Sequence, residues 1–123
     1  MNTMRLIDNF RKAYESALEC KWKGGDTSIT GHLIRRKKRG HFSENATEAD
    51  LIQRGLDVLK SSDSNVYEYI SSRTIYFVVY KEWAVFFDEN GLWDTVFPPD
   101  LPERYFAISK GYRLLGKIGE LIK

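Results

Sequence analysis

The sequence predicts an α+β domain in which N-terminal helices pack on a four-stranded antiparallel sheet, followed by a C-terminal helix. Apolar residues recur at spacings of three and four in the first half of the chain, as in a half-buried helix. The period then changes to short segments rich in β-branched and aromatic residues, and helical spacing returns near the C-terminus. We therefore expect one domain, residues 1–123, with a helical part at 1–62, a β-meander at 65–98 and a C-terminal helix at 101–122.

The first helix is expected from residue 3 to about residue 19, where seven apolar residues form the buried stripe. It ends before Gly24-Gly25-Asp26, which is a strong helix stop. We interpret residues 27–31 as a short polar connection. Leu33 and Ile34 are then expected to anchor a single helical turn.

A second helix is expected to start near Asn45 or Thr47, because Asn45 and Glu48 have the spacing of a capping box. The meander follows, with Lys81-Glu82 as one tight turn and Asp88-Glu89-Asn90-Gly91 as a hairpin turn. Its four strands are expected at residues 66–70, 74–80, 83–87 and 92–97.

The C-terminal helix is predicted from its prolines and its apolar spacing. Pro98-Pro99 closes the last strand because proline cannot donate a hydrogen bond to the ladder. Pro102 suits the first turn of a helix, with Asp100 as a candidate cap. The helix is expected to be weakest near Gly111.

Composition excludes several classes of protein. With 42% hydrophobic and 14% aromatic residues the chain can bury a core, so global disorder is not expected. The single cysteine, Cys20, cannot form an intramolecular disulfide or a cysteine-based zinc site. The N-terminus lacks the order of a signal peptide, and no apolar run approaches the ~20 residues of a membrane span. We expect no membrane partner and a cytoplasmic location, in the producing cell or in a target cell.

The densest chemistry lies in residues 31–42, although the net charge of the chain is only +2. Imidazoles titrate near neutral pH, and fixed cations attract phosphates. The stretch indicates either a site that holds a polyanion and transfers protons on it, or a solvated basic loop with two incidental histidines. It contains both histidines, His32 and His41, and between them Arg35, Arg36, Lys37, Lys38 and Arg39.

Other candidate sites are weaker. Two histidines without paired cysteines or an H-E-x-x-H motif make a poor metal site, so we expect no metal and no other cofactor. We interpret the strand aromatics as core residues rather than as a platform for bases. Asp88 and Glu89 are interpreted as a solvated pair in the hairpin turn. Thr95 is expected to share a strand face with Trp93 and Phe97, where its hydroxyl is either functional or a simple strand-former.

Taken in order, residues 28–99 resemble the barnase–EndoU–colicin–RelE-like ribonuclease superfamily. The likeness is to the C-terminal toxin domains of contact-dependent-inhibition proteins and to related phage-borne domains. The basic run is longer than is usual there, and the segment after Pro99 has no counterpart. The matching features are Gly31-His32, Arg39-Gly40-His41-Phe42, a capped helix at 47–59, and a hairpin at 89–98 that contains Gly91, Thr95, Phe97 and Pro98.

The resemblance implies a metal-independent RNA endonuclease toxin that acts on tRNA or other cytosolic RNA. A base removes the proton of a ribose 2′-OH, whose oxygen attacks phosphorus, and an acid protonates the leaving 5′-oxygen. His32 and His41 are the acid/base candidates, and the sequence does not assign which of them is the base. Lys38, Arg39 and Arg73 are candidate phosphate clamps, and Thr95 is a candidate donor to a phosphoryl oxygen. The expected substrate-binding residues are Arg35, Arg36, Lys37 and Arg39.

A free cytosolic ribonuclease would harm the cell that makes it, so an acidic immunity protein or antitoxin is the expected partner. The alternative is a non-catalytic module, an inactive relative that binds nucleic acid or a protein partner. A third hypothesis is a small immunity-like protein. The basic residues argue against it, because an inhibitor of a basic nuclease is expected to be acidic.

Overall fold

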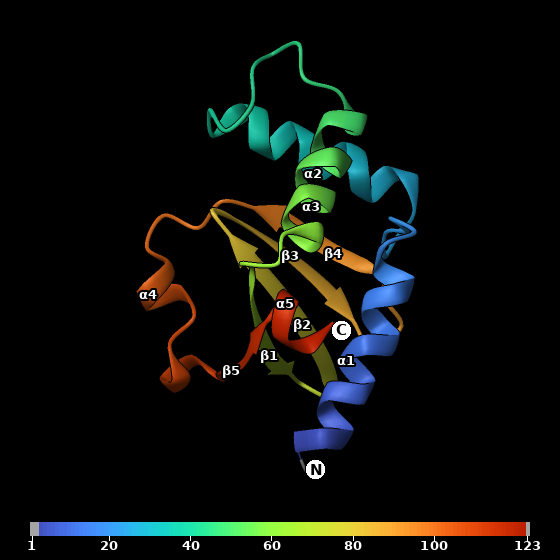
Figure 1. Ribbon diagram of the computed structural model, residues 1–123. Helices are drawn as coiled ribbons and strands as arrows, with labels where there is room; N and C mark the ends of the chain where they lie inside the picture. The colour runs from blue at the N-terminus through green and yellow to red at the C-terminus, as the bar shows by residue number, and fades with distance from the viewer. Residues whose placement is uncertain (1–2, 123) are drawn as a thin grey trace.

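The computed structural model describes residues 3–122 and confirms the α+β class (Figure 1). Its five strands form one antiparallel sheet, one strand more than expected, in the order β4-β3-β2-β1-β5. The strands are β1 (Asn65–Ser71), β2 (Thr74–Lys81), β3 (Trp83–Asp88), β4 (Trp93–Phe97) and β5 (Tyr112–Lys117). The helices are α1 (Thr3–Ala17), α2 (Asp26–Lys38), α3 (Glu48–Lys60), α4 (Pro102–Tyr105) and α5 (Ile118–Leu121), with a 3₁₀ turn, η1 (Ile108–Lys110).

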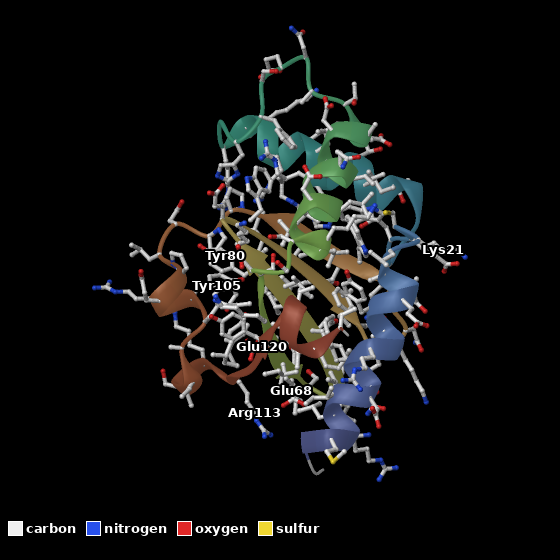
Figure 2. All side chains as sticks on the ribbon, viewed as in Figure 1. Lys21, Glu68, Tyr80, Tyr105, Arg113 and Glu120 are labelled. Carbon is white, nitrogen blue, oxygen red and sulfur yellow. The ribbon has the colours of Figure 1, made fainter. Side chains whose placement is uncertain are left out.

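Two hydrophobic clusters lie on the two faces of the sheet. The larger one packs α1, α3 and α5 against the first face, and α2 lies beyond the β4 edge (Figure 1). The smaller one is mostly aromatic and packs the α4 segment against the second face. Figure 2 shows Tyr80 and Tyr105 between the sheet and α4. The β4 edge is therefore bordered by α2 and, on the second face, by the chain that follows β4.

The helix α2 corrects the sequence prediction, since a polar connection and a single turn were expected where 13 helical residues are found. Its inward side consists of Ile29, Leu33 and Arg36, which are all buried. The apolar pattern is hard to recognise because an arginine occupies the third inward position. Glycine and β-branched residues also lower the helix propensity of its first half. Packing against α3 and β4 overrides that propensity.

The helix α3 begins at the second of the two expected positions. Thr47, not Asn45, is the N-cap: its hydroxyl accepts a hydrogen bond from the Asp50 amide at 3.2 Å. The Asp50 carboxylate in turn accepts one from the Thr47 amide at 2.8 Å. This cap fixes the start of the helix whose Leu51 and Leu59 are fully buried against the sheet.

The four-strand meander has the expected strands and turns, but Asp88 is not solvated. Its side chain is buried, and its carboxylate accepts hydrogen bonds from the amides of Asn90 at 2.9 Å and Leu92 at 3.1 Å. Lys23 lies 3.6 Å from the same carboxylate. Asp88 therefore holds the β3–β4 turn in shape, because its carboxylate accepts from two amides of the turn.

A β-bulge changes which side chains share a face of β4. Phe86 of β3 pairs with Thr95, whereas its neighbour Phe87 pairs with Trp93. The register shift breaks the simple alternation along β4. Trp93 therefore packs in the first-face cluster, while Thr95 lies on the second face with Phe97. The expectation that Thr95 shares a face with Trp93 is wrong, and its sharing a face with Phe97 is confirmed.

The expected C-terminal helix at 101–122 is also wrong. Pro102 does open a helix, but α4 has four residues, and η1 stops at Gly111, which has a left-handed φ of 95°. The next residues form β5, which pairs with β1. Tyr112 of β5 stacks on Tyr69 of β1 with ring centroids 4.4 Å apart. Tyr112, whose spacing suggested a helical stripe, therefore makes a cross-strand contact instead.

Candidate active site at the edge of strand β4

The segment before α2 is joined to β4 through its backbone. The Lys23 amide donates to the Trp93 carbonyl at 2.8 Å, and the Trp93 amide donates to the Lys21 carbonyl at 2.9 Å. These bonds form a parallel bridge between Trp22 and Trp93, whose rings lie 5.5 Å apart. The bridge places the start of α2 beside the sheet edge, so residues along α2 meet residues along β4.

His32 is the first candidate side chain that this placement brings to β4. Its Nδ1 lies 3.5 Å from Thr95 Oγ1 and 3.0 Å from a guanidinium nitrogen of Arg35. Its ring lies 5.1 Å from the ring of Trp22. The sequence prediction placed His32, Thr95 and Arg35 in one site, and the fold brings these three together.

The contacts of Nδ1 define the state of the imidazole. An arginine can only donate, so Nδ1 accepts and the His32 ring is neutral, with its proton on Nε2. Burial lowers the pKa of His32 below its ordinary value of 6.5, and Arg35 and Arg36 lower it further. The carboxylate of Asp94 and a hydrogen bond with its backbone oppose this shift in the pKa. At pH 7 the group is therefore an acceptor of protons rather than a donor.

Arg36 lies one helical turn beyond His32, and its environment is unusual. The side chain is only 6% exposed, and its guanidinium carbon lies 5.6 Å from the centre of the Phe97 ring. Its Nε and one terminal nitrogen are buried without a hydrogen-bond partner. Burial and then Arg39 and Arg35 lower its pKa. A buried cation without a carboxylate is costly, which points to a function rather than to stability.

A left-handed glycine positions His41 at the end of α2. Gly40 has a φ of 73°, the amide of Gly40 donates to the Lys37 carbonyl, and the amide of His41 donates to the Arg36 carbonyl. These two bonds are the Schellman motif, which turns the chain back over the last turn of a helix. The Arg39-Gly40-His41 sequence thus places His41 next to Arg36.

His41 lies apart from His32 and faces a different neighbourhood. Its ring lies 6.0 Å from that of Trp83, and it lines a cavity together with Pro98 and Asp100. Burial and then Arg36 lower the pKa of His41 below 6.5, against the opposing charge of Asp100. Six residues of helix separate His32 from the end of α2, a rise of about 9 Å. The two imidazoles therefore face different points along β4.

Buried nitrogens without partners gather along this flank of the molecule. Within residues 3–122, the buried side-chain nitrogens and oxygens that lack a hydrogen bond belong to Trp22, Arg36 and His41. The atoms of Trp22 and Arg36 are obligate donors. Such atoms are rare in folded proteins and call for an explanation. Here they indicate that an acceptor belongs at the junction of α2 and β4.

The remaining cations of α2 do not form one uniform stripe. A helix distributes consecutive residues around its axis, so Arg36 turns inward while Arg35, Lys38 and Arg39 are exposed and Lys37 is half-buried. All of them stand in or next to the last helical turn, where cations are favoured by the helix dipole. The exposed members are accessible from solvent, whereas Arg36 is not.

Arg73 does not join the site. It lies in the turn before β2, two strands away from β4 in the sheet. The cavity that it lines also contains Lys23 and Asp88 but neither His32 nor Thr95. The fold does not bring Arg73 together with His32 and Thr95, because the sheet order separates it from the edge that meets α2.

Several residues near the site were not singled out from the sequence. Trp22 packs on His32, and the signal for it is the aromatic residue between two lysines just before the glycine stop. Arg104, Tyr105 and Lys110 line the cavity of His41 because α4 and η1 fold back toward β4. In the continuous C-terminal helix expected from the sequence, these residues would not be recognised as neighbours of His41.

No protein-family description, curated protein or solved structure matches the chain. Within residues 3–122, no three His, Cys, Asp or Glu side chains are grouped to hold a metal ion. None of the helices in that part of the chain combines the length and the apolar character that crossing a bilayer requires.

Proposed function

We propose that the protein is an RNA endonuclease toxin that needs no metal and whose reaction takes place between His32 and Thr95. The supporting observation is the 3.5 Å distance between His32 Nδ1 and Thr95 Oγ1, with Arg35 3.0 Å from the same nitrogen. A proton acceptor, a neutral hydrogen-bond donor and a cation converge on one point. This is the set of groups that attack of a hydroxyl on a phosphodiester uses.

In the proposed reaction, Arg35 moves from His32 Nδ1 to a phosphoryl oxygen when RNA binds. Nδ1 then takes the proton of the ribose 2′-OH, and the 2′-oxygen forms a bond to phosphorus. The bond between phosphorus and the 5′-oxygen breaks, and water supplies the proton that the leaving oxygen needs. Thr95 donates a hydrogen bond to the phosphoryl oxygen as its negative charge grows. The products carry a 2′,3′-cyclic phosphate and a 5′-hydroxyl.

His41 receives a different role in this proposal. Its imidazole makes no contact with the His32–Thr95 pair in the described part of the chain, and it opens on a separate cavity. One phosphodiester cannot place its 2′-oxygen on one of these imidazoles and its 5′-oxygen on the other unless they approach each other. We therefore assign the first proton transfer to His32 and a substrate contact to His41.

The experiment that tests the function is digestion of total tRNA by the purified protein in excess EDTA. We expect discrete fragments with 2′,3′-cyclic phosphate ends, while the same RNA with 2′-O-methyl groups stays intact because its nucleophile is blocked. Thr74→Val is a matched control for Thr95→Val, since Thr74 lies in β2 away from α2. Intact tRNA with a shifted band, or cleavage that EDTA abolishes, contradicts the proposal.

A second candidate function is binding of nucleic acid without cleavage, and one observation favours it. The atom that a general base must use, His32 Nδ1, already accepts a hydrogen bond from Arg35. If Arg35 keeps that contact when RNA is bound, the imidazole only orients the arginine toward phosphate. The tRNA digestion separates the two functions, because a binder shifts the RNA without producing ends.

A partner follows from the proposed activity. The exposed cations of the last turn of α2, with Arg39 just after it, are accessible to an acidic protein. An immunity protein or antitoxin that covers Arg35, Lys38 and Arg39 would exclude RNA by occupying the same charges. Expression at high level without a partner and without damage to cellular RNA contradicts this part of the proposal.

A further inference from the structure

The cavity that His41 lines is basic and lies on the sheet face shared by Thr95 and Phe97, just past the end of β4. Its volume is about 320 Å³, and residues of three segments far apart in the chain line it. The first is the turn after α2, the second is the end of β4, and the third is α4 with η1. The cavity-lining residues that matter here are Arg39, His41, Phe97, Tyr105, Arg104 and Lys110.

The charges of this cavity are not neutralised within the protein. Arg39, Arg104 and Lys110 line it, and within residues 3–122 none of the three forms an ion pair. Asp100 is the single carboxylate in the lining. Three unpaired cations against one carboxylate favour the binding of an anion. Because aromatic residues lie beside these cations, the anion that suits the cavity is the phosphate of a nucleotide.

Two aromatic rings form the apolar side of the cavity. Phe97 and Tyr105 lie with ring centroids 5.3 Å apart and an interplanar angle of 64°. Both side chains are half-buried, so part of each ring faces the cavity. The buried guanidinium of Arg36 lies against the Phe97 ring and holds it in place. Aromatic faces beside unpaired cations are the combination that single-stranded nucleic acids use, with bases on rings and phosphates on cations.

The cavity is also continuous with the proposed reaction centre. Thr95 and Phe97 are two residues apart on the same face of β4, a separation of about 7 Å. A chain of RNA that places one phosphate at Thr95 therefore reaches Phe97 with its neighbouring nucleotide. On α2, His32 and Arg36 are one turn apart and follow β4 in the same direction, toward His41.

We propose that this cavity binds the nucleotide next to the cleaved phosphate, with its phosphate on Arg39, Arg104 and Lys110 and its base against Tyr105 and Phe97. The proposal rests on the proposed function for its substrate class. The cavity proposal goes beyond the proposed function by giving the segment after Pro99 a role in holding RNA. It also places His41, which lines the cavity, beside the bound nucleotide.

The test measures binding of a short, fluorescein-labelled 2′-O-methyl oligoribonucleotide, which cannot be cleaved, by fluorescence anisotropy at several salt concentrations. Arg104→Ala/Lys110→Ala removes two cations of the cavity, and Lys12→Ala/Lys21→Ala removes two exposed cations near α1 as the matched control. Because these cations share one phosphate in the proposed complex, we expect the first variant to flatten the slope of log K against log salt by up to about 0.7. The control should keep the slope. Equal slopes for both variants overturn the proposal.

The base contact is tested separately with Tyr105→Leu, using thermal melting to confirm that the variant is folded. We expect its affinity for the oligonucleotide to fall by about fivefold or more, because one base loses the aromatic ring on which it stacks. An oligonucleotide with an abasic site at that position should bind both proteins equally. A Tyr105→Leu variant that loses affinity equally for both oligonucleotides overturns the base contact.

Binding and cleavage keep the two proposals distinguishable. If the oligonucleotide binds as expected but tRNA is not cleaved, the endonuclease function fails and the nucleotide cavity stands. If tRNA is cleaved but Arg104→Ala/Lys110→Ala behaves like its control, the cavity proposal fails and the endonuclease function stands.

Discussion

His32 Nδ1 and Thr95 Oγ1 lie 3.5 Å apart, although 63 residues separate them in the chain. The contact requires a complete α2, a parallel bridge between Trp22 and Trp93, and a bulge in β4 that turns Thr95 to the second face. Their combination places an imidazole and a hydroxyl at one point beside exposed arginine.

The first prediction separates the roles of the two groups. His32→Ala removes the proton acceptor, so we expect the turnover number on RNA to fall by about 10²- to 10⁴-fold. Thr95→Val keeps the shape of the side chain and removes one neutral hydrogen bond of about 0.5–1.5 kcal/mol, a loss of about 2- to 13-fold. His41→Ala should raise KM more than it lowers kcat. Steady-state kinetics on an RNA substrate measure all three.

Two controls accompany this prediction. Thr74→Val should leave kinetics unchanged, and thermal melting should show that each variant is folded. Full activity of His32→Ala contradicts the mechanism. A loss of kcat in His41→Ala as large as that in His32→Ala would instead favour a pair of histidines acting as base and acid.

The second prediction concerns pH. A base acts in its neutral form, and burial with Arg35 and Arg36 lowers the pKa of His32 below 6.5, so the neutral form persists below that pH. We expect kcat/KM to lose half its value at a pH below 6.5 on the acid side. Arg35→Gln removes a cation that lowers the pKa of His32, while Asp94 continues to raise it. The acid limb should therefore move to higher pH, and a pH–rate profile of both proteins measures it.

The same pKa shifts determine how the free energy of unfolding changes with pH. Both histidines have a lower pKa folded than unfolded, so the unfolded chain binds more protons as the pH falls below 6.5. Their contribution to the free energy of unfolding is present above that pH and decreases through the window between 6.5 and the folded pKa. An increase in the melting temperature on acidification from pH 7 to below 6.5 would contradict these histidine environments.

The fold was predictable where local signals agree. The strands of the meander follow from β-branched residues and turn residues, and α1 follows from its apolar period. The helix α2 was not predictable in full, because Arg36 stands where a pattern requires an apolar residue. The strand β5 was missed because the spacing of Tyr112 and its apolar neighbours fits a helix until Gly111 breaks it and β1 supplies a partner.

The candidate site was predictable in its members but not in its geometry. His32, Arg35 and Thr95 can be named from residue type and resemblance, and Arg73 was named by the same logic. Only the sheet order tells that Arg73 lies two strands from β4. Arg104 and Lys110 could not be found from spacing, since their contact with the turn after α2 depends on how α4 folds back.

The third prediction uses the buried arginine. The Nε and terminal nitrogen of Arg36 lack partners, and each buried unsatisfied donor costs about 1–3 kcal/mol. Arg36→Met keeps an unbranched apolar chain in place of the arginine stem and removes those donors, so we expect the free energy of unfolding to rise by at least about 1 kcal/mol. RNA affinity should fall at the same time. Urea unfolding and anisotropy measure the two quantities.

The matched control is Arg35→Met, an exposed arginine one residue earlier, which should change the free energy of unfolding by less than about 0.5 kcal/mol. A stability that falls in Arg36→Met means that the guanidinium is a structural group, through its contact with Phe97. In that case its burial gives no support to an anion at the α2–β4 junction.

The fourth prediction compares a glycine inside α2 with the glycine just after its end. Gly40 has a φ of 73°, where an alanine is strained by about 1–2 kcal/mol. Gly31 lies inside α2, where an added Cβ would meet no other atom within 4 Å, so alanine there stabilises the helix by about 0.5–1 kcal/mol. Gly40→Ala should also weaken RNA binding because it displaces His41. Urea unfolding of Gly31→Ala and Gly40→Ala checks the opposite signs, and equal signs would refute the assignment of the end of α2.

The fifth prediction tests whether the exposed cations of α2 follow an RNA backbone. For single strands, the slope of log K against log salt is about −0.7 for each phosphate contacted. Because Arg36 is buried, the exposed group is Arg35, Lys38 and Arg39. Replacing all three by glutamine should therefore flatten the slope by about 2. The weakening should be similar for different RNA sequences, because phosphate contacts position a strand without distinguishing its bases.

Two further proteins make this result specific. Replacing Lys12, Lys21 and Lys60 by glutamine removes the same charge from other exposed positions and should keep the slope. His32→Ala should keep the slope as well, since a neutral imidazole at pH 7 releases no counterion, while it loses turnover. An unchanged slope in the first variant would mean that the last turn of α2 faces solvent when RNA is bound. The RNA strand would then have to reach Thr95 only from the side of the cavity that His41 lines. In that case, replacing Arg104 and Lys110 would remove the whole salt dependence.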